Sequence, residues 1–202
     1  MVLKNRIPVS LLGISSDLTF SILTPLTIGS LTGLITKSSV NDWYPDLRKP
    51  KLNPPRWLFP IAWTYLYVSM GLGSHLIYRT LLNGTSSLEM IQIAEKVLRL
   101  YYIQLGLNFI WTPLFFGLRR PDLALLDIIG LTGTVLTMTN LSRRVNTKVT
   151  YLFIPYALWV SYATYLNSGI WYLNGGSEKI KVLFNKIKGM CCTSCSKDQK
   201  DD

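Results

Sequence analysis

Three apolar stretches of the chain carry aromatic or amide side chains at intervals of three or four residues, which places them on one face of an α-helix. The three stripes are Trp63, Tyr67 and Met70; Gln104, Asn108 and Trp111; and Trp159, Ala163, Leu166 and Asn167. Polar groups inside a membrane bundle usually face its interior, so the stripes predict a common site for a flat, largely apolar ligand with a few polar groups. The alternative is ordinary packing between helices, in which the amides bond to each other.

Other kinds of chemistry have little support in this sequence. The single His75 excludes an HExxH zinc site, and no Gly-rich phosphate loop follows a strand. Cys191, Cys192 and Cys195 form a compact cluster, but three cysteines without a nearby histidine fall short of the usual four zinc ligands. Beside the basic segment SEKIKVLFNKIKGM they predict palmitoylation, with an inert tail as the alternative. We expect no metal, no required cofactor and no nucleic-acid partner.

The composition indicates how the stripes are positioned. The 202 residues are 49% hydrophobic and only 16% charged, with net charge +10 and mean hydropathy +0.26. Long segments almost free of charge therefore alternate with short basic ones, and each is close to the roughly 20 residues that a helix needs to cross a bilayer. These segments are 18–36, 57–78, 100–118, 123–141 and 149–174.

The predicted fold class is an all-α, integral membrane bundle of five transmembrane helices. An open sheet would leave unpaired peptide groups in lipid, and no period-2 alternation supports a barrel. We expect an uncleaved leader at 1–17 (a signal peptide is the alternative), the membrane domain at 18–174 and a basic cytosolic tail at 175–202. Thirteen Lys and Arg residues on the face of the tail, against eight on the other, indicate this orientation.

A stiff, basic loop precedes the second predicted helix. Its prolines fix the backbone and cannot continue a helix, so the segment is either a lid over the site or a rigid connector at the lipid surface. The residues assigned to the lid are Trp43, Pro50, Pro54 and Pro55. In the first predicted helix, Gly29 and Gly33 form a GxxxG pair that permits close helix approach, and Gly33 is also a candidate ligand contact.

Four segments of the chain resemble the TspO/MBR family of translocator proteins. They are WYPDLRKPKLNPPRW, FPIAWTYLYVSMGLGS, QLGLNFIWTPLFFG and PYALWVSYATYLN, and they occur in the family's order over roughly residues 22 to 174. The resemblance implies a five-helix membrane protein, commonly dimeric, whose first loop caps a pocket open toward the cytosol. It implies porphyrin ligands such as protoporphyrin IX and haem, with cholesterol in animal members.

The resemblance also implies roles for individual residues. The helix 2 tryptophan that bacterial relatives use in porphyrin breakdown matches Trp63, and the pocket asparagine matches Asn108, with Gln104 beside it. The helix 5 pocket residues match Trp159, Ala163, Leu166 and Asn167, the stripe that spacing had already indicated. The cholesterol-recognition pattern is incomplete, because the basic residue after Leu166 and Tyr172 comes one position late, at Lys179.

Three functions follow from these observations. The first is a translocator or receptor that binds porphyrins, and sterols as a second class, for transport or sequestration. The second is an enzyme-like oxidative degradation of protoporphyrin at Trp63, and the third is a scaffold that works through its basic tail. Membrane lipid is an expected partner, and a homodimer is expected. The resemblance favours the mitochondrial outer membrane, with the endoplasmic reticulum and secretory membranes as the alternative.

Overall fold

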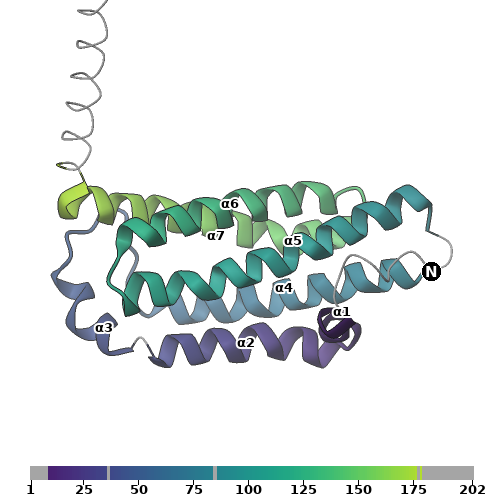
Figure 1. The fold of residues 1–202 in the computed structure, drawn as a ribbon, viewed down its shortest axis with the longest axis horizontal. Coiled ribbons are helices and arrows are strands. Elements are labelled where there is room, and N and C mark those ends of the chain that lie inside the picture. Colours follow the sequence, from purple (N-terminus) through teal and green to yellow (C-terminus); the bar gives the residue numbers. More distant parts are fainter. Residues whose placement is uncertain (1–8, 36, 84–85, 177, 179–202) are drawn as a thin grey trace, which may run out of the picture.

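Five long helices lying side by side form the body of the protein (Figure 1). The computed structural model describes residues 9–35, 37–83, 86–176 and 178, and these ranges contain helices but no strand, which confirms the all-α prediction. The long helices are α2 (Leu18–Ile35), α4 (Leu58–Leu82), α5 (Leu88–Thr112), α6 (Pro121–Ser142) and α7 (Thr147–Trp171). The predicted palmitoylation sites Cys191, Cys192 and Cys195 lie outside the described residues.

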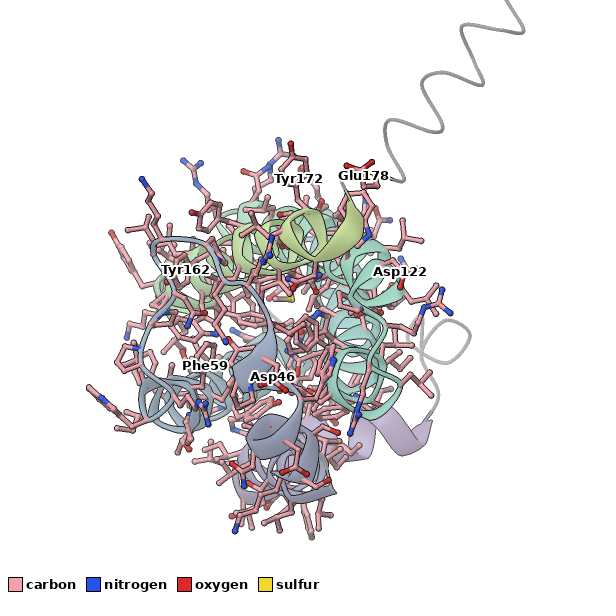
Figure 2. All side chains as sticks on the ribbon, turned by 90° about the vertical axis from the view of Figure 1, so that its left-hand side faces the viewer. Asp46, Phe59, Asp122, Tyr162, Tyr172 and Glu178 are labelled. Carbon is pink, nitrogen blue, oxygen red and sulfur yellow. The ribbon has the colours of Figure 1, made fainter. Side chains whose placement is uncertain are left out.

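Short elements occupy the two ends of the bundle (Figure 1). At one end lies α1 (Val9–Ser16), in the predicted leader; its Ser15 hydroxyl shares a hydrogen bond of 2.6 Å with the Tyr102 hydroxyl. At the other end lie α3 (Lys37–Asp42) and the 3-10 turn η2 (Tyr44–Asp46), within the predicted loop. Figure 2 looks onto this end, where the segment between α3 and α4 crosses the bundle.

Two of the long helices end in wider π-helical turns on the α3 side. These are η3 (Pro113–Gly117), which continues α5, and η4 (Tyr172–Gly176), which continues α7. The predicted helix 100–118 therefore ends where expected, but its start was wrong by twelve residues. Ser87 caps α5 by accepting a hydrogen bond from the Met90 N–H. The prediction missed the first half of this helix because it searched for long stretches almost free of charge, and that half is charged.

Apolar character alone identifies fewer crossings than the five that were predicted. Among the described helices, α6 by itself is long and apolar enough to cross a membrane, and α2 qualifies together with α3 as a bent pair. The other long helices fall short because they contain amides, tyrosines and hydroxyls, and because α5 includes Glu89, Glu95, Lys96 and Arg99. The count of five crossings is not confirmed by this measure.

Small residues set the distance between neighbouring helices. A Cβ on Gly71 of α4 would lie 2.3 Å from the Ser21 carbonyl oxygen of α2, and one on Gly73 would lie 2.5 Å from the Phe153 ring of α7. The core around these contacts includes the fully buried Met70 and Ile77. Helices α2, α4 and α7 are thus packed closely in the half of the bundle toward α1, and the site lies in the other half.

Candidate ligand-binding site

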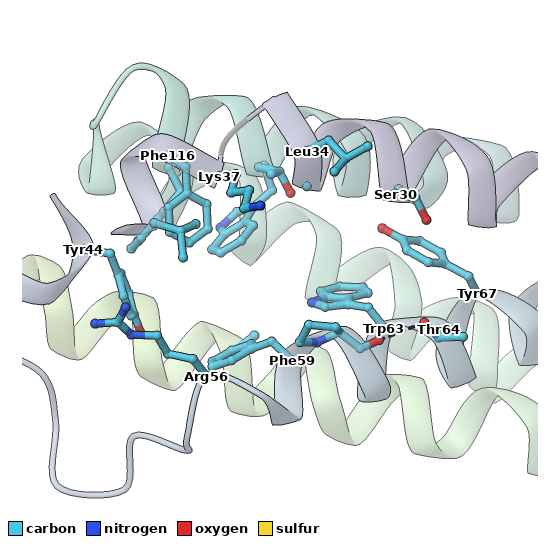
Figure 3. A pocket seen from close by; sticks show the side chains of 18 of the residues that line it. Ser30, Leu34, Lys37, Tyr44, Arg56, Phe59, Trp63, Thr64, Tyr67 and Phe116 are labelled. Atoms are coloured by element: carbon cyan, nitrogen blue, oxygen red, sulfur yellow. Dashed lines mark hydrogen bonds between the residues drawn. The ribbon is translucent and has the colours of Figure 1, made fainter. Parts of the chain in front are cut away.

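A cavity of about 470 Å³ lies between α2, α4, α5 and α7 at the end covered by α3 (Figure 3). Side chains of α2 face those of α4 across it, and Tyr44 and Phe116 lie toward the α3 end. The lining residues are Leu26, Gly29, Ser30, Gly33, Leu34, Lys37, Val40, Tyr44, Arg56, Phe59, Pro60, Trp63, Thr64, Tyr67, Trp111, Thr112, Phe115, Phe116, Trp159, Ala163, Leu166, Asn167 and Ile170.

Aromatic pairs form the walls of this cavity. The Trp63 indole stacks on the Tyr67 ring with centroids 5.5 Å apart and planes inclined by 29°. The Phe59 and Trp159 rings meet edge to face at 5.9 Å. Such contacts hold flat rings in fixed orientations, so the walls are preformed for another flat ring.

Most of the predicted ligand contacts line the cavity. These are Gly33, Trp63, Tyr67, Trp111, Trp159, Ala163, Leu166 and Asn167. Gln104 and Asn108 are not among the described lining residues and lie in the core, where they are 0% and 4% exposed. Helical periodicity placed them correctly on the inner face of α5, but not at the depth of the cavity.

The two amides instead belong to a buried chain of hydrogen bonds that joins three helices. The Tyr67 hydroxyl donates to Asn108 Oδ1 at 3.0 Å, Asn108 Nδ2 donates to the Tyr156 hydroxyl at 3.2 Å, and that hydroxyl donates to Gln104 Oε1 at 2.6 Å. Both amides are therefore bonded within the protein core, outside the described lining of the cavity. Tyr67 is the member of the chain that also lines the cavity.

Asn167 has a positioning role in the cavity wall. It is 1% exposed, its Oδ1 accepts a hydrogen bond from Trp111 Nε1 at 3.0 Å, and its Nδ2 donates to the Pro121 carbonyl at 2.9 Å. The Trp111 indole in turn stacks on Phe115, with centroids 5.0 Å apart. Asn167 therefore fixes one aromatic wall and ties α7 to the start of α6.

The predicted lid residues do not themselves reach the cavity. Trp43, Pro50, Pro54 and Pro55 are not among its described lining residues. Trp43 packs on Phe115 with ring centroids 5.7 Å apart, and the Pro50 ring packs against α7, where a Cβ on Gly169 would lie 3.0 Å from it. Tyr44 and Arg56 are the residues of the same segment that line the cavity.

Hydrogen bonds tie this covering segment to α7 and η4. The Asn174 amide accepts from the Arg48 N–H at 3.0 Å and donates to the Arg48 carbonyl at 2.9 Å, and the Tyr162 hydroxyl donates to the Leu52 carbonyl. Inside the segment, the Tyr44 hydroxyl donates to Asn53 Oδ1 at 3.0 Å, and burial raises the pKa of Tyr44, which keeps it protonated. The segment is a fixed cover over this end of the bundle.

Two cations, Lys37 and Arg56, lie at the covered end of the cavity, and none of its described lining residues is acidic. Lys37 follows the first predicted helix by one residue, and Arg56 directly precedes the second. Sequence analysis did not assign either to the site. The sequence could have indicated them, because a basic residue after one membrane-spanning run and another before the next lie near the membrane surface on the same side.

Comparison with known proteins connects this site to one family. Residues 21–173 match the sequence profile of the TspO/MBR family. The chain is 38% identical over 155 residues to the tryptophan-rich protein TspO of Archaeoglobus fulgidus, covering 76% of this chain and 94% of that protein. It is 37% identical over 152 residues to a translocator protein homolog of Schizosaccharomyces pombe, covering 75% of this chain and 88% of the relative.

A mammalian relative has the same level of similarity. The chain is 38% identical over 135 residues to the translocator protein of Ovis aries, covering 66% of this chain and 76% of that protein. The region 21–173 that matches the family profile contains the long helices, apart from the first three residues of α2, and every described residue that lines the cavity. The chain belongs to the TspO/MBR family, whose members are membrane proteins.

Proposed function

We propose that this protein crosses its membrane five times and binds a flat, anionic amphiphile, a porphyrin such as protoporphyrin IX or haem, for transport or sequestration. The observation that carries the proposal is an aromatic-walled, apolar cavity whose described charged lining residues are the cations Lys37 and Arg56. The names of several relatives, translocator protein among them, support a role in moving a ligand.

Five crossings are supported by the surface of the long helices. Each carries large apolar side chains that are exposed: Phe20, Leu31 and Leu34 on α2, Ile61 and Tyr65 on α4, Ile103 and Ile110 on α5, Leu126 and Ile129 on α6, and Tyr151 and Leu158 on α7. A soluble protein rarely exposes apolar side chains all around its body, whereas lipid requires it. At 1.5 Å per residue, the 18 residues of α2 span about 27 Å and the 25 of α4 about 37 Å, against a hydrocarbon core of about 30 Å.

The chemistry of a porphyrin is complementary to that of the cavity. Its ring would lie between the Trp63 and Trp159 walls, where apolar burial and ring stacking stabilise it. Its carboxylates would reach Lys37 and Arg56, which lie at the end of the cavity near the membrane surface. In this arrangement the cations bind the carboxylates in place of the predicted donors Asn108 and Asn167, whose amides make hydrogen bonds inside the protein.

Removal of the two cations tests the proposed pairing. In a dark titration followed by tryptophan quenching, Lys37→Gln and Arg56→Gln are each expected to weaken protoporphyrin IX binding about threefold to tenfold, as expected for a partly solvated ion pair of about 0.7 to 1.4 kcal/mol. The dimethyl ester, which lacks the negative charges, is expected to bind wild type and both variants equally. Lys51→Gln, at an exposed position of the same segment, is the matched control.

Two results would count against the proposal. Quenching that does not saturate in wild type would mean that the porphyrin only partitions into detergent, and the proposed function would be wrong. Saturable binding with equal losses for the acid and the ester would retain the cavity but remove Lys37 and Arg56 as carboxylate partners.

A second candidate function, oxidative degradation of protoporphyrin by light and dioxygen, rests on Trp63. The Trp63 indole lines the cavity and stacks on Tyr67, so an oxidised indole would have an electron donor at a centroid distance of 5.5 Å. If this reaction occurs, illumination is expected to bleach the porphyrin visible spectrum irreversibly in wild type and at least tenfold more slowly in Trp63→Phe. Trp57→Phe, at an exposed site outside the cavity, is the control, and equal bleaching in both variants would exclude a role for Trp63.

The cellular setting is part of the proposal and rests on the family resemblance alone. We infer a homodimer in the mitochondrial outer membrane, with the endoplasmic reticulum and secretory membranes as the alternative, and sterols as a second ligand class. Imaging of the tagged chain beside organelle markers tests the location.

A further inference from the structure

Helices α2 and α4 touch closely in one half of the bundle. A Cβ on Gly71 would lie 2.8 Å from the Ile22 Cα, so the two backbones are in contact there. Nearer the cavity, the Tyr67 ring fills the space beside Gly29, where a Cβ would lie 2.2 Å from it. Beyond Tyr67, toward α3, the cavity itself separates the two helices (Figure 3).

We call the line along which α2 and α4 separate beside the cavity the seam. Its edges belong both to the cavity and to the protein surface. Ser30 and Leu34 on α2, and Pro60 and Thr64 on α4, line the cavity and are also exposed. The Ser30 hydroxyl donates to the Leu26 carbonyl at 2.7 Å, and the Thr64 hydroxyl donates to the Pro60 carbonyl at 2.9 Å. Each edge is thus bonded to its own helix, and these hydroxyls do not hold the seam closed.

The surface onto which the seam opens is apolar. Leu31 lies one residue from Ser30 on α2 and is 57% exposed. Ile61 follows Pro60 and Tyr65 follows Thr64 on α4, and they are 60% and 57% exposed. In a bilayer these side chains would contact acyl chains. Because lipid tails are as apolar as the seam, no hydrophobic force drives the two edges together.

The water-facing end of the cavity is different. It is covered by the segment that Asn174, Tyr162 and Pro50 tie to α7 and η4. A ligand entering from water would have to break these contacts, whereas one entering along the seam would meet edges whose hydroxyls are bonded within their own helices.

We propose that the seam between Ser30 and Leu34 on α2 and Pro60 and Thr64 on α4 is a lateral portal, through which a membrane-dissolved amphiphile enters the cavity from the acyl-chain region. The identity of the probe rests on the proposed porphyrin-binding function, but the portal follows from the geometry of the two helices. The protein then exchanges its ligand with the lipid phase, and the covering segment need not open.

Rates of exchange separate a portal from a contact site. In proteoliposomes, stopped-flow quenching by protoporphyrin IX is expected to show that Ser30→Phe/Thr64→Phe lowers both the association rate and the dissociation rate by at least tenfold, whereas damage to a contact site alone would raise the dissociation rate. Ser30→Ala/Thr64→Ala, which widens the seam, is expected to raise both rates. Thr27→Phe/Val68→Phe, at exposed positions outside the cavity, is the matched control and is expected to leave both rates unchanged.

Asn174→Ala tests the aqueous route. It releases the covering segment from η4, and entry through the portal predicts unchanged rates, whereas entry from water predicts faster association. The portal proposal would be wrong if the Phe and Ala variants at Ser30 and Thr64 both had unchanged rates, or if Asn174→Ala bound faster. Saturable binding in the same experiments would still support the porphyrin site.

A measurement without porphyrin keeps the portal testable if wild type fails to bind it. Gly33→Cys, in a chain with Cys191, Cys192 and Cys195 replaced by serine, places a thiol on the cavity wall where a Cβ meets nothing within 4 Å. A membrane-dissolved maleimide is expected to label it at least tenfold more slowly when Ser30→Phe/Thr64→Phe is added. Equal labelling would refute the portal whatever the ligand.

Discussion

Gly33→Phe is expected to weaken protoporphyrin IX binding by at least a hundredfold, while leaving the unfolding temperature of the protein unchanged. Gly33 lies on the cavity wall, and a Cβ there would meet nothing within 4 Å, so a ring can be added without displacing protein atoms and would extend into the space that the ligand needs. A loss of that size corresponds to about 2.7 kcal/mol of binding free energy. The measurement is the dark quenching titration, with thermal unfolding recorded on the same sample.

The control for this variant is another glycine with open space around it. Gly133→Phe on the exposed face of α6 adds the same ring away from the cavity, and it is expected to bind like wild type. Undiminished binding by folded Gly33→Phe would mean that the porphyrin occupies another part of the protein, and the cavity would lose its assigned role.

Gly71→Ala is expected to lower the free energy of unfolding by about 2 to 3 kcal/mol, as is typical of overpacking at a tight contact. Its Cβ would lie 2.3 Å from the Ser21 carbonyl oxygen and 2.8 Å from the Ile22 Cα, and backbone atoms cannot move aside as a flexible side chain can. Helix α2 must therefore shift away from α4. Equilibrium unfolding of the purified protein in mixed micelles measures the effect.

Gly130→Ala provides the comparison, since both residues lie inside a helix but no atom lies within 4 Å of a Cβ at Gly130. Alanine favours helix over glycine by about 1 kcal/mol, so this variant is expected to be neutral or slightly more stable. Equal stability of the two variants would show that α2 is not held against α4 at Gly71. The seam beside the cavity would then have no tight contact between the two helices at its closed end.

The buried chain from Tyr67 to Gln104 shows how one sequence pattern can have two outcomes. The spacing of Gln104 and Asn108 indicates an inward-facing stripe, and both ligand contact and interhelical bonding were consistent with it. In the structure the amides make interhelical bonds, because Tyr156 of α7 comes within hydrogen-bond distance of both and Tyr67 of α4 within that of Asn108. Unpaired amides in this buried interior would be costly, and the tyrosine hydroxyls bond to them.

The covering segment illustrates a second limit of sequence reading. Its prolines predicted stiffness, but stiffness does not identify which side chains face the cavity. Pro50 packs against α7 at Gly169, whereas Tyr44 and Arg56 line the site. Contacts with a helix more than a hundred residues away in the chain decided this orientation.

Local information in the sequence determined the all-α class, most helix boundaries and the inward faces of Trp63, Trp111 and Trp159, because helical periodicity and apolar length depend only on neighbouring residues. The search for apolar length did not detect the charged start of α5. Only the tertiary structure decided that Lys37 and Arg56 share the cavity, that the amides of α5 are bonded to tyrosines, and that a seam separates α2 from α4. These features depend on distances between helices, which close packing at Gly71 and Gly29 sets and which no single segment encodes.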